Sequence, residues 1–136
     1  MLPRFAEHTS TCGLMVNRQR IRRTVCAELR KVRSSRQALR TPDRIPTDRR
    51  DYMRVWVRVA DDMLASLRED GEDRAQFVDA LYGITRRPIG SGRYVFSVSM
   101  HKYHMSASGL ERWRDNAVFT ASILAVLYGA INPTSE

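Results

Sequence analysis

Apolar side chains recur three or four residues apart in several segments of this chain, which is the spacing that places them on one face of an α-helix. One such segment spans residues 14–39, a second spans residues 52–67, and a third begins at Leu110 and continues through Trp113 and Ala117. A shorter helix is expected over residues 72–82, with Gly83 after its end. This periodicity predicts an all-α fold.

The residue pattern of one segment is also compatible with β-structure. Residues 94–100 alternate large apolar with smaller or polar side chains, as a half-buried strand would. The preceding connection, residues 84–93, is rich in glycine and arginine, so it is expected to be flexible and cationic. A short β-hairpin near residues 88–100 is therefore the alternative to a helix there.

Prolines mark the clearest internal boundary of the chain. Pro42 and Pro46 lie between the first and second helical segments, where polar residues also disfavour a helix. We expect a basic N-terminal helical arm over residues 1–40, a linker over residues 41–50, and a C-terminal helical domain over residues 51–136. The length of 136 residues suits one compact domain with an arm rather than two independent domains.

The charge of the chain favours an anionic partner. Its 23 Lys and Arg residues exceed its 15 Asp and Glu residues, giving a net charge of +8. The excess is concentrated in residues 1–50, which hold 13 basic and 4 acidic side chains. Nucleic acid is the leading candidate, because phosphate neutralisation releases counterions. Arg20 and Arg23 are candidate phosphate contacts on the N-terminal arm; the alternative is a solvated helix whose arginine stems cover the edges of the core.

The helix that starts near residue 107 has the composition of a helix that reads DNA. Ser106 is expected to cap its N-terminus. Leu110, Trp113 and Ala117 share a buried face, so that polar groups on the other faces are free to meet base edges and phosphates. The candidate residues on this helix are Ser106, Ser108, Arg112 and Arg114. Candidate phosphate contacts outside it are Arg86, Arg87, Arg93 and Lys102; the alternative for the loop arginines is that they only keep the loop soluble.

This C-terminal part resembles the helix-turn-helix of sigma-factor region four and of the small phage transcription regulators built on it. The residues that carry the resemblance are Leu81, Tyr82 and Gly83 at the end of one helix, and Met105, Ser106, Leu110, Trp113 and Ala117 at the start of another. It covers roughly the last 60 residues, on the scale of a trihelical DNA-binding unit. The chain has His104 where the family's turn often has glycine, and Gly109 lies inside the proposed recognition helix.

Phage late-gene antitermination proteins of the Q type are the nearest functional parallel. The resemblance implies a sequence-specific regulator of transcription, of phage or prophage origin, that binds double-stranded DNA and acts with RNA polymerase or a sigma factor as an antitermination factor. The rival hypothesis is a basic helical protein-interaction factor, such as a host-protein inhibitor or an assembly factor, that binds nucleic acid only non-specifically. Sequence preference for one duplex would separate the two hypotheses.

The sequence gives little sign of catalysis or of metal binding. Cys12 and Cys26 form no Cys-x-x-Cys pair, and His101 and His104 have no further ligand fixed nearby. No phosphate-binding glycine loop or nucleophile motif occurs, and the acidic clusters suit solvated helix ends. We therefore expect no enzyme activity, no cofactor and no metal site.

The remaining expectations concern location and association. The N-terminus carries no apolar run of the length of a signal sequence, and residues 123–128, the longest apolar run, are too few to span a bilayer. A location in the cytoplasm of a bacterial host cell, away from the membrane, is expected. The second half of the last helix, residues 118–128, is apolar on more than one side. It is expected to pack against the domain or against a second copy in a homodimer.

Overall fold

The computed structural model describes the backbone of residues 4–133 and the side chains of residues 17–133. Every regular element of that part is a helix, which confirms the predicted all-α class. The elements are α1 (Arg4–Leu29), α2 (Val32–Ala38), the 3-10 helix η1 (Pro42–Arg44), α3 (Thr47–Asp70), α4 (Glu72–Tyr82), α5 (Gly92–Tyr103) and α6 (Ala107–Leu127).

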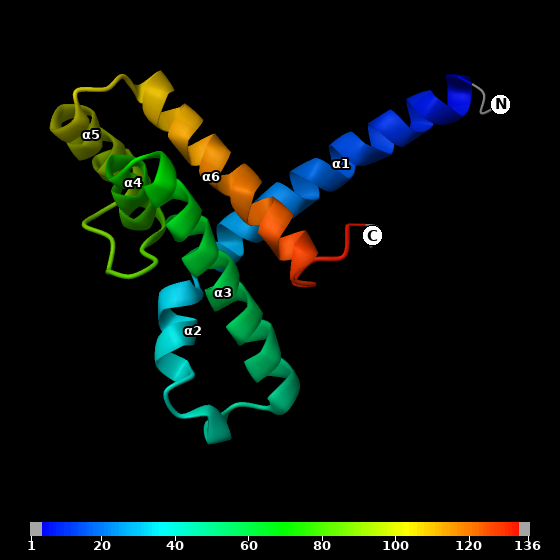
Figure 1. The fold of residues 1–136 in the computed structure, drawn as a ribbon, viewed down its shortest axis with the longest axis horizontal. Helices are drawn as coiled ribbons and strands as arrows, with labels where there is room; N and C mark the ends of the chain where they lie inside the picture. Colours follow the sequence, from blue (N-terminus) through cyan, green and yellow to red (C-terminus); the bar gives the residue numbers. More distant parts are fainter. Residues whose placement is uncertain (1–3, 134–136) are drawn as a thin grey trace.

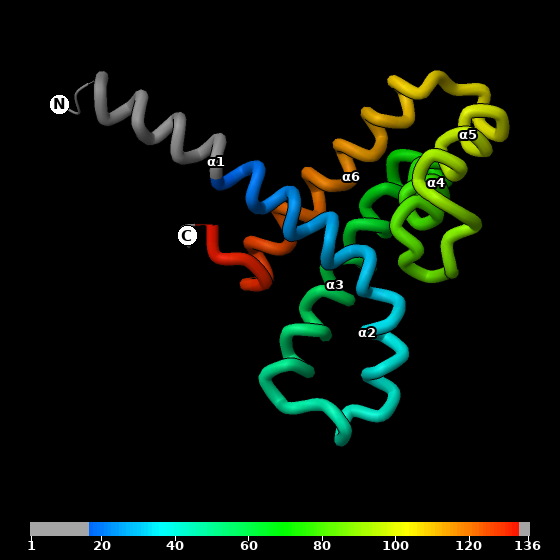
Figure 2. The backbone as a smooth tube through the Cα atoms, turned by 180° about the vertical axis from the view of Figure 1, so that it is seen from behind, coloured from blue at the N-terminus to red at the C-terminus, as the bar shows by residue number. Residues whose placement is uncertain are grey.

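The helices are grouped at two ends of the molecule. Figure 1 shows α4, α5 and the beginning of α6 together at one end, and a hairpin of α2 and the first half of α3 at the other. Between them α1 crosses α6, as the reverse view in Figure 2 also shows. α3 runs from the hairpin into the body and packs against both α4 and α6. The first turns of α6 therefore lie far from the α2–α3 hairpin.

One hydrophobic core joins these groups. Its largest fully buried side chains include Trp56 and Met63 of α3, and Phe77 of α4. Val25 and Leu29 of α1 are also fully buried in it. Of the apolar stripe expected in residues 52–67, the part from Trp56 to Leu67 is buried in the core, whereas Tyr52 at its start is exposed. The basic segment that precedes the prolines contributes its own apolar face to the same core.

The β-hairpin considered for residues 88–100 is wrong, because residues 92–103 form α5. Ser91 caps this helix, and its Oγ accepts a hydrogen bond from Tyr94 N at 3.2 Å. Val95 and Ser99, one helical turn apart, are buried against the rest of the domain. The alternating pattern arises from strand-favouring residue types, and packing against α4 and α6 outweighs that preference.

The basic segment is not the single helix that was expected over residues 14–39. The chain turns at Arg30 and Lys31, where Lys31 N donates to Glu28 O at 3.0 Å. This turn directs α2 along α3, and Arg36 of α2 binds both carboxylate oxygens of Asp61, at 3.0 and 2.5 Å. α3 begins at Thr47, within the segment expected to be the linker.

Candidate nucleic-acid interface

α6 begins where the sequence predicted a recognition helix. Ser106 is its N-cap residue, and the Ser106 Oγ accepts a hydrogen bond from Gly109 N at 3.1 Å. Leu110 and Ala117 are fully buried, and Trp113 is partly buried against the same core. The predicted cap and the predicted buried face of this helix are both confirmed.

Aromatic contacts hold the start of α6 against α4 and α5. The ring centroid of Phe77 in α4 lies 5.3 Å from that of Phe96 in α5 and 6.3 Å from that of Trp113 in α6. Tyr103, at the end of α5, lies 6.0 Å from Trp113. Such edge-to-face and tilted ring pairs stabilise beyond the apolar area they bury. The first two turns of α6 are therefore anchored on one side by the neighbouring helices.

The connection between α5 and α6 is a tight turn of three residues. His104 adopts the left-handed conformation at φ 54°, where the resembling family often has glycine. Met105 N donates to Met100 O at 3.1 Å, which closes the end of α5. A Cβ atom at Gly109 would lie only 2.7 Å from Met105 Cε. Glycine inside α6 thus lets the Met105 side chain fold against the first turn of the helix.

The first turns of α6 expose three of the four residues predicted on this helix. Ser106, Ser108 and Arg112 are exposed, and Arg112 forms no ion pair within the described part of the chain. Arg114 lies differently: its side chain is 33% exposed, and its Nε donates to Asp115 Oδ1 at 3.2 Å. The Arg114 guanidinium also lies 5.8 Å from the ring centroid of Phe96. Arg112 is therefore the arginine of α6 that is free to meet a ligand.

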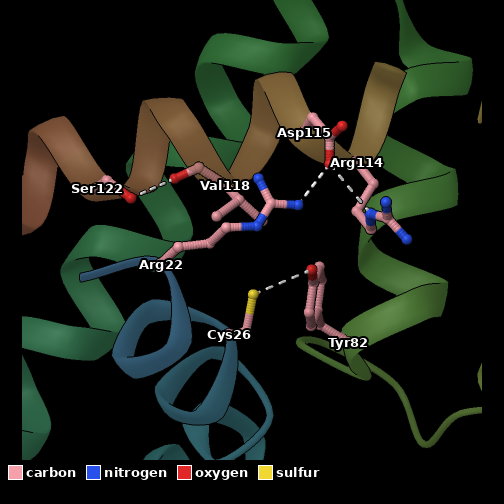
Figure 3. A network of polar contacts seen from close by, with 7 residues as sticks. All are labelled: Arg22, Cys26, Tyr82, Arg114, Asp115, Val118 and Ser122. Atoms are coloured by element: carbon pink, nitrogen blue, oxygen red, sulfur yellow. Dashed lines mark hydrogen bonds and ion pairs between the residues drawn. The ribbon is translucent and has the colours of Figure 1, made fainter. Parts of the chain in front are cut away.

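Asp115 links α6 to α1. Its Oδ1 accepts from Arg22 Nη2 at 2.5 Å, as Figure 3 shows. The hydrogen bond from Arg22 lowers the pKa of Asp115, and the same bond raises the pKa of Arg22. Below this pair in Figure 3, Cys26 Sγ of α1 lies 3.7 Å from the Tyr82 hydroxyl of α4, and burial raises the pKa of that tyrosine. This network could not be predicted from the sequence, because its members are far apart in the chain and no local pattern pairs them.

A groove of about 470 Å³ runs between α4, the following loop and α5. Arg86, Arg87 and Lys102, three of the predicted phosphate contacts, line it, and none of them forms an ion pair with another described residue. The acidic residues of its lining are engaged locally: Glu72 with Arg68 at 3.7 Å, and Asp79 with the backbone and side chain of Thr85. The groove therefore presents a net cationic wall. Arg93 is exposed in the first turn of α5 but does not line it.

The two predicted residues of the N-terminal arm lie apart from this groove. Arg20 donates from Nη2 to Asn132 O at 3.3 Å, and its Nε is buried, so that its side chain is held by the C-terminal end of the described chain. Arg23, three residues on, is exposed. Of the two, Arg23 is the one that faces solvent.

No group of three or more His, Cys, Asp or Glu side chains in the described part of the chain is placed to hold a metal ion. In the same part, no helix is both long and apolar enough to cross a membrane. Comparisons of the chain with family models, with curated proteins and with solved structures find no match.

Proposed function

We propose that this protein binds double-stranded DNA and reads its sequence with the first two turns of α6. The observation that carries the proposal is the division of those turns into two faces. Leu110 and Trp113 anchor one face to α4 and α5. Ser108 and Arg112 are exposed on the other. A helix held on one side and open on the other is the arrangement that a groove-reading helix needs.

The exposed groups suit the chemistry of base edges. An α-helix with its side chains is about 10–12 Å across, which fits the major groove of about 12 Å. An arginine such as Arg112 can donate both arms of its guanidinium to O6 and N7 of guanine. Ser106 and Ser108 offer hydroxyls to bases or phosphates at the helix N-terminus, where the helix dipole also favours an anion.

Cationic side chains outside α6 supply the contacts to phosphate. Lys102 stands near the end of α5, just before the turn into α6, and shares its groove with Arg86 and Arg87. Arg93 is a further exposed cation, in the first turn of α5. Such contacts fix the register of a protein on a duplex without reading sequence. In the proposal Arg114 positions Asp115 and does not contact DNA. Of the two candidate phosphate contacts on α1, the proposal keeps Arg23 and drops Arg20, which is bound to Asn132 O.

The biological role follows from the resemblance to sigma-factor region four and to Q-type regulators. We propose that the protein controls transcription of phage or prophage genes in the bacterial cytoplasm, with RNA polymerase or a sigma factor as its protein partner in antitermination. This role assigns no catalysis and no cofactor to the chain.

Selection from a pool of randomised duplexes tests the proposal. The affinity of the full chain is measured for the selected duplex and for a scrambled duplex of equal length, at several salt concentrations. Both affinities should fall as salt rises, because phosphate contacts release counterions, while the selected duplex keeps an advantage of about 1,000-fold or more. Equal affinity for the two duplexes at every salt concentration would reject the proposal and support a basic protein-interaction factor instead.

A further inference from the structure

A row of large apolar side chains is exposed along the second half of α6. Phe119, Ile123 and Leu127 are 65%, 46% and 71% exposed. They follow one another at intervals of four residues, so they lie on one face of the helix over a length of about 12 Å. We call these three residues the apolar ridge. A contiguous exposed apolar surface is characteristic of interaction sites.

A groove of about 490 Å³ lies along the same part of α6, where α1 crosses it. Its walls include Ile21 of α1 and Val118 and Val126 of α6, and the ridge residues form one of its edges. Most of the surface that lines it is apolar. Two of its polar side chains have partners: Ser122 Oγ donates to Val118 O at 2.7 Å, and Arg22 is bound to Asp115. The groove can therefore accept apolar side chains at little cost in desolvated polar groups.

The distribution of charge limits which kind of molecule can bind the apolar ridge and groove. The chain carries a net charge of +8, yet residues 116–127 of α6 contain no charged side chain. Of the charged residues that line the groove, Arg18 is the one with no ion pair in the described part of the chain. A nucleic acid would gain almost nothing here, because its binding relies on many cations. A neutral apolar surface of a partner suits this groove, and the ridge face of α6 in a second copy of the chain is such a surface.

We propose that a second copy of this chain docks on the apolar ridge and groove. The ridge and the groove lie next to each other on one molecule, so a two-fold axis near Ile123 places the ridge of each copy against the groove of the other. Antiparallel α6 helices then bring Phe119 of one copy towards Leu127 of the second. Such an isologous contact uses the same patch twice, as in most homodimers. The lack of charged side chains in residues 116–127 lowers the repulsion between two cationic chains at the contact.

This proposal stands independently of DNA binding, and its test contains no DNA. Sedimentation equilibrium of the full chain over a wide range of protein concentration measures the association. Ile123→Glu places two carboxylates near the two-fold axis and should weaken the dimer by about 100-fold or more. Ser66→Glu is the matched control, because Ser66 is exposed on α3 and receives the same charge. It should leave the dimer unchanged, and circular dichroism checks that both variants remain helical.

A cysteine at the proposed axis identifies the occupant. Ile123→Cys should form a disulfide between two copies under mild oxidation, whereas Ser66→Cys should give no more than the unsubstituted chain with its native cysteines. A monomer at every concentration, a dimer that Ile123→Glu does not weaken, or equal cross-linking of the two cysteine variants would overturn the proposal. Binding of the monomer to neutral phosphatidylcholine vesicles, lost in Ile123→Glu, would also overturn it and assign the ridge to lipid.

Discussion

Arg22 Nη2 lies 2.5 Å from Asp115 Oδ1, although the two residues are 93 positions apart in the chain. The contact joins α1 to α6 three residues after Arg112, an exposed residue of the proposed recognition helix. Asp115 also accepts from Arg114, so that it draws two guanidinium groups to the same carboxylate. An arginine of the basic N-terminal segment thus holds α6 through a contact within the protein.

A double-mutant cycle should reveal the coupling of this pair. Arg22→Ala, Asp115→Ala and the double variant are compared by urea unfolding. Because the side chains are 45% and 48% exposed, we expect a coupling free energy of about 0.2–1 kcal/mol, in the range of exposed pairs. Strictly additive effects of the two substitutions would show that the contact contributes nothing to stability.

The stability that Asp115 contributes should depend on pH. The Arg22 hydrogen bond lowers the pKa of Asp115 in the folded protein below its ordinary value of 3.8. Its contribution is therefore complete above that value and is lost as the pH falls through the lowered pKa. The difference in unfolding free energy between the unsubstituted chain and Asp115→Asn should be constant near neutral pH and shrink below about pH 4. A difference that does not change in acid would contradict this account.

Tyr82 should make the protein sensitive to alkali. Burial raises its pKa in the folded state, while the unfolded chain releases the phenol proton near its ordinary pKa of about 10. Stability is then complete below that pH and falls as the pH rises above it. Tyr82→Phe keeps the ring and should lose less unfolding free energy than the unsubstituted chain between about pH 8 and pH 11. Parallel losses in the two proteins would show that Tyr82 is not responsible.

Substitutions at two residues with left-handed backbone conformation should change the stability of the protein in opposite directions. Gly83 has φ 64°, and a Cβ atom there would lie 2.6 Å from Pro88 Cγ, so Gly83→Ala should destabilise by roughly 1–3 kcal/mol. His104 has φ 54° with a side chain present, so His104→Gly should stabilise by up to about 1 kcal/mol. Thermal and chemical unfolding measure both effects. Destabilisation by His104→Gly would mean that its side chain makes a contact that outweighs the backbone strain.

Local signals were sufficient to place the elements that flank the candidate interface. Gly83 ends α4 in a left-handed conformation, and Ser106 caps α6, so that the expected bounds of these helix ends match the structure. The buried face of α6 followed from the spacing of its apolar residues. These features depend on residues close in sequence, which is why periodicity and capping rules identify them.

Features that depend on distant residues could not be predicted. The chain turns at Arg30 and Lys31 because α2 packs along α3. No residue within 14–39 indicates where α3 lies in the fold. Helical spacing predicted that Arg114 would lie on the exposed face of α6. In the structure its side chain instead contacts Asp115 and the ring of Phe96. The helix at residues 92–103 likewise depends on burial of Val95 against other helices.

An arginine proposed to contact bases and an arginine proposed to contact phosphates should differ in their effect on DNA binding. Arg112→Ala removes a proposed base contact, so it should weaken the selected duplex more than a scrambled one, by about 1–3 kcal/mol. Arg23→Ala removes an exposed cation of α1 and should weaken both duplexes alike. Fluorescence anisotropy at fixed salt measures the four affinities. Equal losses on both duplexes from Arg112→Ala would show that this residue does not read sequence.

The contact surface itself gives the most direct test of the claim that α6 reads DNA. Backbone amide shifts of the labelled full chain are followed by NMR while the selected duplex is added. The account predicts that the largest changes fall on residues 106–112, with smaller changes at Arg86, Arg87 and Lys102. Changes confined to α1 and to the α2–α3 hairpin, with residues 106–112 unaffected, would contradict it.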